Sequence, residues 1–408
     1  MIKTYKFRIY PSKKQEVKLI GTLNTCRWLY NSSLAERKHQ AEMNKLYSYL
    51  QLFPFGKPEW IDYYDQARDL TVSKTNEQKL VYAQVLQNVL RRLDKSFKNF
   101  FNGYGYPRFQ GRNRYDSFTY PQKGFSITDE GKLNLSKIGD IKLIQHREIE
   151  GKIKTCTIKR DVDQWYVSFS VEMNNTSCTE MTGKSIGIDV GLKSLITLSD
   201  GEQVAPPQYL RQSEEKMVRA QRSLSRKIKG SNNRNKQRIK VAKLHRNIRN
   251  QRQDFAHKVS RKLVNAYDLI VFEKLQIQNM VKNHRLAKSI SDAGWYQLIQ
   301  FTKHKAEYAC KVVELVDPKN TTQNCSSCGK KVPKSLSVRI HKCPYCGLEM
   351  DRDVNAAINI LKRVGAGHAR INACGDVRWN VNEAGGRHLV DGGMSPGYTN
   401  RMNLNCSI

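Results

Sequence analysis

Apolar and polar residues alternate in the first segment of the chain and then change to a helical spacing. Residues 4–10 (TYKFRIY) alternate and end at Pro11, which predicts a strand. From residue 12 to about 101, apolar side chains recur every three or four positions, most clearly over residues 85–100, which predicts helices. The glycines and proline of residues 103–107 (GYGYP) end this helical part.

The next part of the chain returns to a strand-like spacing. Residues 106–171 contain short strand patterns, and residues 154–158 and 165–171 alternate most regularly. Together with the first strand they predict a β-barrel-like module into which the helical segment is inserted. Residues 174–183 (NNTSCTEMTG) are small and polar and predict a linker.

A new domain is predicted to start at Ser185. Residues 185–201 (SIGIDVGLKSLITLSDG) predict two strands, the second of which ends in a hairpin-type turn at Asp200-Gly201. A basic helical region follows from about 208 to 264, and its break near residues 230–233 predicts two antiparallel helices. The remaining patterns predict, in order, a strand at 267–273, a helix at about 291–310, a strand at 311–316, a helix from residue 351, and a loose or disordered tail from about residue 365.

Length and charge indicate that this set of elements binds a polyanion. The 408 residues suffice for two or three domains. The formal net charge is +33, and so much like charge repels itself unless a partner such as nucleic acid neutralises it. No apolar run approaches the roughly 20 residues of a membrane span. No export signal is visible either, so we expect a cytoplasmic protein without a membrane partner.

Four of the ten cysteines predict a metal site. Cys325, Cys328, Cys343 and Cys346 form C-x2-C-x14-C-x2-C, and four thiolates complete a tetrahedral shell around one structural Zn²⁺. Two redox-active C-x-x-C pairs are the alternative interpretation. His341 is expected to lie at the surface. The scattered cysteines are expected to be reduced and not paired in disulfides: Cys26, Cys156, Cys178, Cys310, Cys374 and Cys406.

Three acidic residues at the ends of elements predict a second, catalytic metal site. Asp189 lies among apolar neighbours in IGIDVG, Glu273 ends the apolar run LIVF, and Asp353 begins a predicted helix in DRDVNAA. Taken singly, they have ordinary alternatives, namely a turn residue, an exposed charge and a helix N-cap. Together they suit Mg²⁺, which takes oxygen ligands. Two such ions about 4 Å apart can activate water and stabilise the leaving oxygen in phosphodiester hydrolysis.

A series of short motifs spans nearly the whole chain up to about Gly375. In chain order they are FRIYPSKKQ, WLYNSSLAER, GYPRFQGR, GIDVGLKSL, RQDFAHKVSRKLV, VFEKL, SISDAGW, CSSCG, CPYCG, DRDVNAAINIL and NACG. In this order they resemble the TnpB family of transposon-encoded proteins, relatives of type V CRISPR effectors. The resemblance implies an RNA-guided DNA endonuclease in which Asp189, Glu273 and Asp353 form the catalytic triad and hold two Mg²⁺ ions. Lys274 departs from the family, where an Asp or Asn is common.

The resemblance also implies a fold class and a domain order. The fold is expected to combine α/β, α and β parts. A RuvC nuclease domain of RNase H-like fold carries a zinc-ribbon insertion, and a β-barrel wedge with a helical recognition insertion precedes it. The expected boundaries are 1–11 and 104–178 for the wedge, 12–103 for the recognition lobe, 184–319 and 350–372 for the RuvC-like domain with its basic helical hairpin, 320–349 for the ribbon, and 373–408 for a flexible tail.

Basic and aromatic residues predict contacts with nucleic acid. Acids are nearly absent from residues 216–252, which favours contact with an RNA or heteroduplex backbone over a solvated face of mixed charge. Aromatic and arginine residues interleave over residues 104–114, although Phe109 is expected to belong to the barrel core. Gln87 resembles a family position that faces the DNA motif. The predicted contact residues are Gln87, Tyr104, Tyr106, Arg108, Arg112, Arg114, Arg222, Arg226, Lys236, Lys240, Arg246 and Arg249.

The partners implied by the resemblance are a guide RNA and target double-stranded DNA. The RNA selects the sequence, and the protein reads a short flanking motif. We expect one monomer on each RNA and association with the nucleoid. The alternatives are a nuclease-inactive RNA-guided repressor, a strand-transfer transposase and a compact CRISPR effector. The intact triad argues against the first, and the position of the ribbon and the N-terminal motifs argue against the second.

Overall fold

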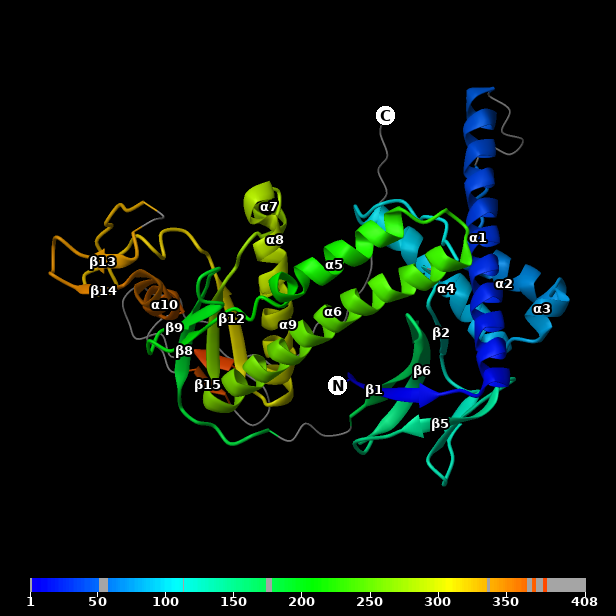
Figure 1. Cartoon of the computed structure of the whole chain (residues 1–408), viewed down its shortest axis with the longest axis horizontal. Coiled ribbons are helices and arrows are strands. Elements are labelled where there is room, and N and C mark those ends of the chain that lie inside the picture. The colour runs from blue at the N-terminus through cyan, green and yellow to red at the C-terminus, as the bar shows by residue number, and fades with distance from the viewer. Residues whose placement is uncertain are drawn as a thin grey trace. The chain divides into compact units, whose positions relative to one another are not determined.

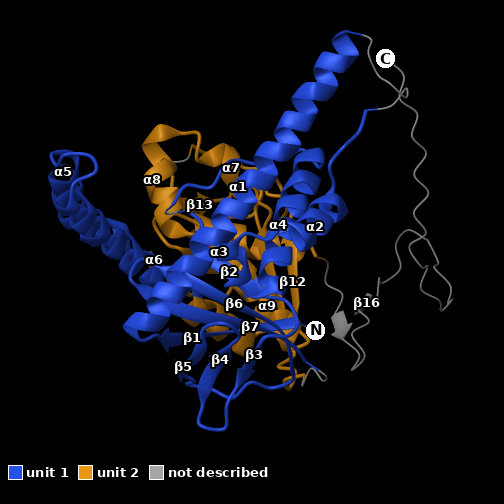
Figure 2. Cartoon of the chain, turned by 90° about the vertical axis from the view of Figure 1, so that its right-hand side faces the viewer, with its two compact units in different colours: residues 1–177, 208–256 blue, residues 178–207, 257–408 orange. Residues whose placement is uncertain are grey.

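The computed structural model describes residues 2–50, 58–112, 114–173, 178–335, 338–364, 369–371 and 377–379. The chain divides into two compact units (Figure 2): unit 1 comprises residues 1–177 and 208–256, and unit 2 comprises residues 178–207 and 257–408. Most of the basic helical region, which was expected within the nuclease domain, therefore clusters with unit 1. Much of the predicted tail, including Cys374 and Cys406, lies outside the described residues.

Unit 1 is built on a seven-stranded antiparallel sheet (Figure 1). Its strands are β1 (Ile2–Tyr10), β2 (Ser117–Tyr120), β3 (Phe125–Ile127), β4 (Lys132–Leu135), β5 (Gly139–Ile144), β6 (Lys152–Asp161) and β7 (Gln164–Glu172). They lie in the order β2-β6-β7-β1-β5-β4-β3. Side chains alternate along each strand, so Tyr5, Phe7 and Ile9 of β1 are all buried. The expected barrel is not confirmed, because no hydrogen-bonded pairing among the described residues joins β2 to β3.

The predicted helical segment follows β1 in unit 1. Its described helices are α1 (Lys13–Tyr49), α2 (Tyr63–Val72), α3 (Asn76–Lys79) and α4 (Ala83–Phe101). Helix α1 begins directly after Pro11 because Ser12 and Gln15 form a capping box, in which each side chain accepts a hydrogen bond from the backbone N–H of the other. The apolar stripe of α4 is buried as far as Leu93, as its spacing predicts, whereas Phe100 near the end of the helix is exposed. No helix of the described residues is long and apolar enough to cross a membrane.

The basic region forms the predicted pair of helices. These are α5 (Tyr209–Ser225) and α6 (Asn232–Ala266). Arg234 fixes their connection, because its Nη1 donates to the carbonyls of Leu224 and Lys227, each at 2.8 Å. These bonds join the start of α6 to the backbone at and just after the end of α5.

Unit 2 contains a five-stranded sheet. Its strands are β8 (Ser185–Val190), β9 (Ile196–Leu198), β10 (Gln203–Val204), β11 (Leu269–Glu273) and β12 (Val312–Val316), in the order β10-β9-β8-β11-β12. Strands β8, β11 and β12 are parallel, and β9 and β10 add antiparallel pairings. Every residue of β11 is buried, as expected for the central strand of a parallel set. The predicted turn at Asp200-Gly201 lies between β9 and β10, and Gly201 has a φ of 94°.

The remaining elements of unit 2 surround this sheet. Besides the end of α6, its described helices are α7 (Ile277–Met280), α8 (His284–Ala293), α9 (Trp295–Tyr308) and α10 (Arg352–Lys362). The single helix predicted at about 291–310 is divided at Gly294, whose φ of 65° ends α8. The ribbon contains β13 (Ile340–Lys342) paired with β14 (Glu349–Asp351). Two short stretches of the predicted loose tail, β15 (Ala369–Ile371) and β16 (Val377–Trp379), are also paired strands.

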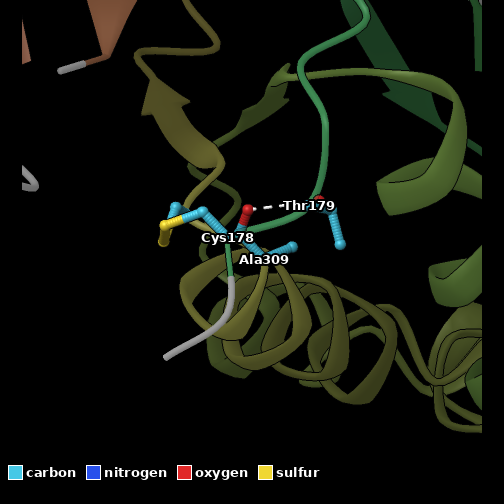
Figure 3. Close-up of a disulfide and its surroundings, with 4 residues drawn as sticks. Cys178, Thr179 and Ala309 are labelled. Atoms are coloured by element: carbon cyan, nitrogen blue, oxygen red, sulfur yellow. Dashed lines mark hydrogen bonds between the residues drawn. A yellow bond between two sulfur atoms is a disulfide. The ribbon is translucent and has the colours of Figure 1, made fainter. Parts of the chain in front are cut away.

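Two of the cysteines expected to be reduced form a disulfide. Cys178, which precedes β8, is bonded to Cys310, which follows α9 (Figure 3). The hydroxyl of Thr179 donates to the carbonyl of Ala309 at 3.3 Å and holds the same two segments together. The two cysteines are 132 residues apart, so their proximity follows from the packing of unit 2 and not from a local sequence signal.

His341 is also placed differently from the expectation. It was expected at the surface, but its side chain is fully buried within the ribbon. His341 is the middle residue of the three-residue strand β13, opposite Met350, so its side chain points away from the exposed side chains on either side of it. Its Nδ1 contacts the Nζ of Lys334.

Candidate active site

Two of the predicted catalytic carboxylates lie at the same edge of the unit 2 sheet. Ile188 of β8 is paired with Phe272 of β11, so the next residues, Asp189 and Glu273, are neighbours on parallel strands. Their side chains are buried, with relative exposures of 8% for Asp189 and 6% for Glu273. The alternatives of a turn residue and an exposed charge are therefore wrong for these two positions.

Helix α10 brings the third carboxylate to this edge. It packs on β8 at Gly187, where an added Cβ would lie 2.1 Å from the carbonyl oxygen of Ala357. Asp353 lies in the first turn of this helix, and it is close enough to Asp189 for its charge to raise the pKa of that carboxyl. The N-cap alternative for Asp353 is wrong, because Asp351 caps α10 by accepting hydrogen bonds from two backbone N–H groups of its first turn.

The three carboxylates share one electrostatic environment. Burial, and then the charges of Glu273 and Asp353, raise the pKa of Asp189 to about 8. Burial also raises the pKa of Glu273, while the hydrogen bond from Thr321 and the charge of Arg363 oppose this shift. A site that penalises negative charge in this way favours a bound cation. The carboxylate donor set therefore fits a divalent metal such as Mg²⁺.

Protein groups bind two of these carboxylates. Thr321 donates from its hydroxyl to Oε1 of Glu273. Arg352 donates twice to Oδ1 of Asp353, at 3.0 and 2.9 Å, and Arg339 lies 3.6 Å from Oδ2. Among the described residues, only the four ribbon cysteines place three or more potential ligand atoms all within 4.8 Å of one another. The carboxylates are thus gathered at one sheet edge without forming so close a cluster.

The ribbon cysteines have the arrangement of one tetrahedral site. The Sγ atoms of Cys325 and Cys346 are 3.6 Å apart, and those of Cys328 and Cys343 are also 3.6 Å apart. A tetrahedral zinc ion with Zn–S bonds of about 2.3 Å requires sulfur–sulfur distances of about 3.8 Å. None of the four is in a disulfide, and the glycine after each pair has a left-handed backbone that permits a tight turn. The donor set fits a closed zinc shell.

Two buried polar residues were not predicted from the sequence. Asn355 of α10 is fully buried, and its side chain bonds to both sides of Cys325: Oδ1 accepts from the N–H of Ser326 at 2.9 Å, and Nδ2 donates to the carbonyl of Asn324 at 2.8 Å. Thr321, 2% exposed, binds Glu273 as described above. The available signal was Asn355 and Asn359 at i and i+4 in a helix whose other inward positions are apolar.

Most of the predicted nucleic-acid contacts lie at the surface of unit 1. Arg246 does not, because its side chain is 8% exposed and pairs with Asp163 at 2.8 Å, which gives it a structural partner. Arg249 pairs with Asp161 but stays half exposed. Phe109 was expected in the barrel core but is 51% exposed. The exposed candidates are Gln87, Tyr104, Tyr106, Arg108, Arg112, Arg114, Arg222, Arg226, Lys236 and Lys240.

Family models match three parts of the chain. The model described as "Probable transposase" matches residues 168–284, and "Cas12f1-like, TNB domain" matches residues 295–360, which include the ribbon and most of α10. The model described as "Helix-turn-helix domain" matches residues 1–45. The described residues of that segment form β1 and most of the single long helix α1, so they do not form a helix-turn-helix.

Two similar proteins cover nearly the full chain, and a third covers about half of it. A protein of Escherichia coli strain K12 named as an RNA-guided DNA endonuclease, InsQ, is 31% identical over 92% of this chain and 94% of its own length. A Streptomyces pristinaespiralis protein, also named as an RNA-guided DNA endonuclease, is 34% identical over 92% of this chain and 91% of its own length. The CRISPR-associated endodeoxyribonuclease Cas12f1 of Sulfoacidibacillus thermotolerans is 27% identical over 48% of this chain and 50% of its own length.

Proposed function

The chain belongs to the TnpB family, and on this premise we propose that it is an RNA-guided DNA endonuclease. It binds a guide RNA derived from the transposon and cuts complementary double-stranded DNA next to a short flanking motif. Cleavage of this kind supports maintenance of the transposon. Two relatives that each align with 92% of the chain carry the name of this activity, which supports the proposal.

The observation that carries the proposal is the position of three acidic residues around one sheet edge. Asp189 and Glu273 end neighbouring parallel strands, and Asp353 lies in the first turn of the helix packed on them. Buried carboxylates at this edge do not stabilise the fold. Burying negative charge there costs stability, as the raised pKa of Asp189 indicates. A requirement for a cation explains why acids occupy these positions.

In the proposed mechanism, Asp189, Glu273 and Asp353 are the ligands of two Mg²⁺ ions. Bound there, two Mg²⁺ ions would supply the positive charge that activates a water molecule and stabilises the leaving 3′ oxygen. Asp189 would hold such an ion in its ionised form and would lose its proton on binding. Arg352 holds Asp353 through two hydrogen bonds and limits its rotation before the cation arrives.

The other parts of the chain have proposed roles in binding. Cys325, Cys328, Cys343 and Cys346 hold one structural Zn²⁺, and the ribbon helps to load the target strand. The exposed basic face of α5 and α6 contacts the guide RNA or its heteroduplex, since it carries many cations and few acids. We further propose that one monomer acts on each RNA and that the protein associates with the nucleoid.

The test is cleavage by a reprogrammed complex. RNA that copurifies with the protein is sequenced, its variable end is replaced by a new guide, and the complex is incubated with plasmids that carry the matching target. We expect one defined RNA species and Mg²⁺-dependent cutting of the matched plasmid alone. Asp189→Ala should abolish cutting and leave RNA binding intact. Random cellular RNA, or cutting that survives Asp189→Ala, would contradict the proposal.

The same experiment tests two of the alternative functions. A nuclease-inactive repressor would bind the matched plasmid and leave it uncut. A strand-transfer transposase, which the description "Probable transposase" of one matching family model suggests, would join DNA ends without a guide. The neighbouring carboxylates at the sheet edge disfavour the first rival, because an inactive protein has no need to retain them.

A further inference from the structure

The segment from residue 318 to residue 326, here called the ribbon root, connects β12 to the first pair of ribbon cysteines. The ribbon root forms hydrogen bonds to β11 and to α10, which carry residues of the candidate active site. Thr321, near its middle, has its hydroxyl within hydrogen-bonding distance of two acceptors, Oε1 of Glu273 and the carbonyl of Pro318, which share its single proton. Thr321 is 2% exposed, so its hydroxyl is shielded from bulk solvent.

Helix α10 is attached to the same segment. Asn355 bonds to the backbone on both sides of Cys325, and Asn359 donates to the carbonyls of Thr321 and Asn324 at 2.9 and 2.7 Å. Both asparagines lie on the helix whose first turn carries Asp353. The position of Cys325 and the position of this helix are therefore set by one buried network of hydrogen bonds.

The second half of the ribbon reaches the active site from the other side. The backbone N–H of Arg352 donates to the carbonyl of Arg339, just before β13, at 2.7 Å. The guanidinium of Arg352 spans from the carbonyl of Val338, at 3.1 Å, to Oδ1 of Asp353. Strand β14 runs directly into Asp351, which caps α10. Both halves of the ribbon are thus connected to the carboxylates that bind the cation.

We propose that the zinc ribbon positions the catalytic carboxylates through Thr321 and Asn355, in addition to any contact of the ribbon with DNA. Zinc holds Cys325, Cys325 fixes the ribbon root, and the root orients Glu273 and the helix that carries Asp353. Thr321 and Asn355 are positioning residues in this scheme, because neither ligates either metal. The inference rests on the proposed nuclease function and adds that zinc occupancy sets the affinity of the active site for its divalent cation.

The test measures Mn²⁺ binding to the full chain, without DNA, by electron paramagnetic resonance. Thr321→Val keeps the shape of the side chain and removes the hydroxyl, and we expect Mn²⁺ affinity to fall by about tenfold, as for other residues that orient metal ligands. Thr321→Ser restores the hydroxyl and should restore affinity. Thr302→Val is the matched control, because Thr302 is equally buried and bonds only a helix carbonyl of α9.

Two further variants test the zinc side of the inference. Cys328→Ser weakens the zinc shell without touching the root, and Asn355→Leu breaks the link while leaving all four cysteines. Both should lower Mn²⁺ affinity, and a colorimetric zinc assay should show zinc loss for the first variant. Wild-type Mn²⁺ affinity in a folded Thr321→Val chain, or in a zinc-depleted Cys328→Ser chain, would overturn the inference. Failure of the wild type to cut guided targets would instead overturn the proposed function.

Discussion

At Asp189, a single carboxyl group makes the stability of the cation-free protein depend on pH. Burial and the neighbouring carboxylates raise its pKa from 3.8 to about 8. Between these two values the native state binds a proton that the unfolded state has released. The free energy of unfolding therefore falls as pH rises through this window. It stops falling on account of Asp189 once pH exceeds the native pKa of about 8.

Replacing Asp189 by Asn should remove this dependence. Asparagine does not titrate, so in magnesium-free buffer the variant should gain stability relative to the wild type as pH rises from about 5 to about 9. We expect its melting temperature at the higher pH to exceed that of the wild type by at least ~2 °C, which corresponds to roughly 1 kcal/mol. Scanning fluorimetry at both pH values measures the difference. If the melting temperatures of the variant and the wild type differ by the same amount at both pH values, the raised pKa of Asp189 is contradicted.

At the scale of elements, the disulfide joins the segment before β8 to the end of α9. Cys310 has a left-handed backbone, with a φ of 56°, at a position where helices commonly end in glycine. The crosslink spans 132 residues, and a loop of that length contributes about 5 kcal/mol by restricting the unfolded chain. This contribution should depend on the redox state of the solution.

We expect a reductant to lower the melting temperature of the wild type by several degrees. Cys178→Ser should melt at the lower temperature with or without reductant, since it has no crosslink to lose. Peptide mapping under non-reducing conditions identifies the linked pair directly. Equal melting of the wild type with and without reductant, after mapping has shown the link, would contradict a stabilising role for the disulfide.

Elements and contacts differ in how far the sequence determines them. Asp189 could be recognised because a carboxylate among apolar strand residues is costly, and Gly187 beside it marks the close approach of α10. The hydrogen bonds of Asn355 and Thr321 could not be recognised from the sequence. Each joins segments about thirty or more residues apart, and only tertiary packing brings these segments together. The disulfide between Cys178 and Cys310 could not be predicted for the same reason. Barrel closure was not predictable either, since strand alternation fixes which face is buried but not which edges meet.

Over the whole molecule, the net charge of +33 makes nucleic-acid binding a sum of many phosphate contacts. Each contact that releases a counterion adds to the slope of log affinity against log salt concentration. The basic residues of α6 do not all contribute. Lys243 and Arg246 pair with Asp163, whereas Lys236 and Lys240 are exposed one helical turn apart. The second pair should therefore bind RNA more strongly than the first.

Replacing Lys236 and Lys240 together by alanine should weaken binding of the copurified RNA and lower the salt slope by about one to two. Filter binding across a series of salt concentrations measures both quantities. The control is the double replacement of Lys14 and Lys18, which have the same spacing and exposure on α1 but lie outside the predicted contact set. If both double variants lower the slope equally, binding reflects the overall charge of the protein and not a defined face of α6.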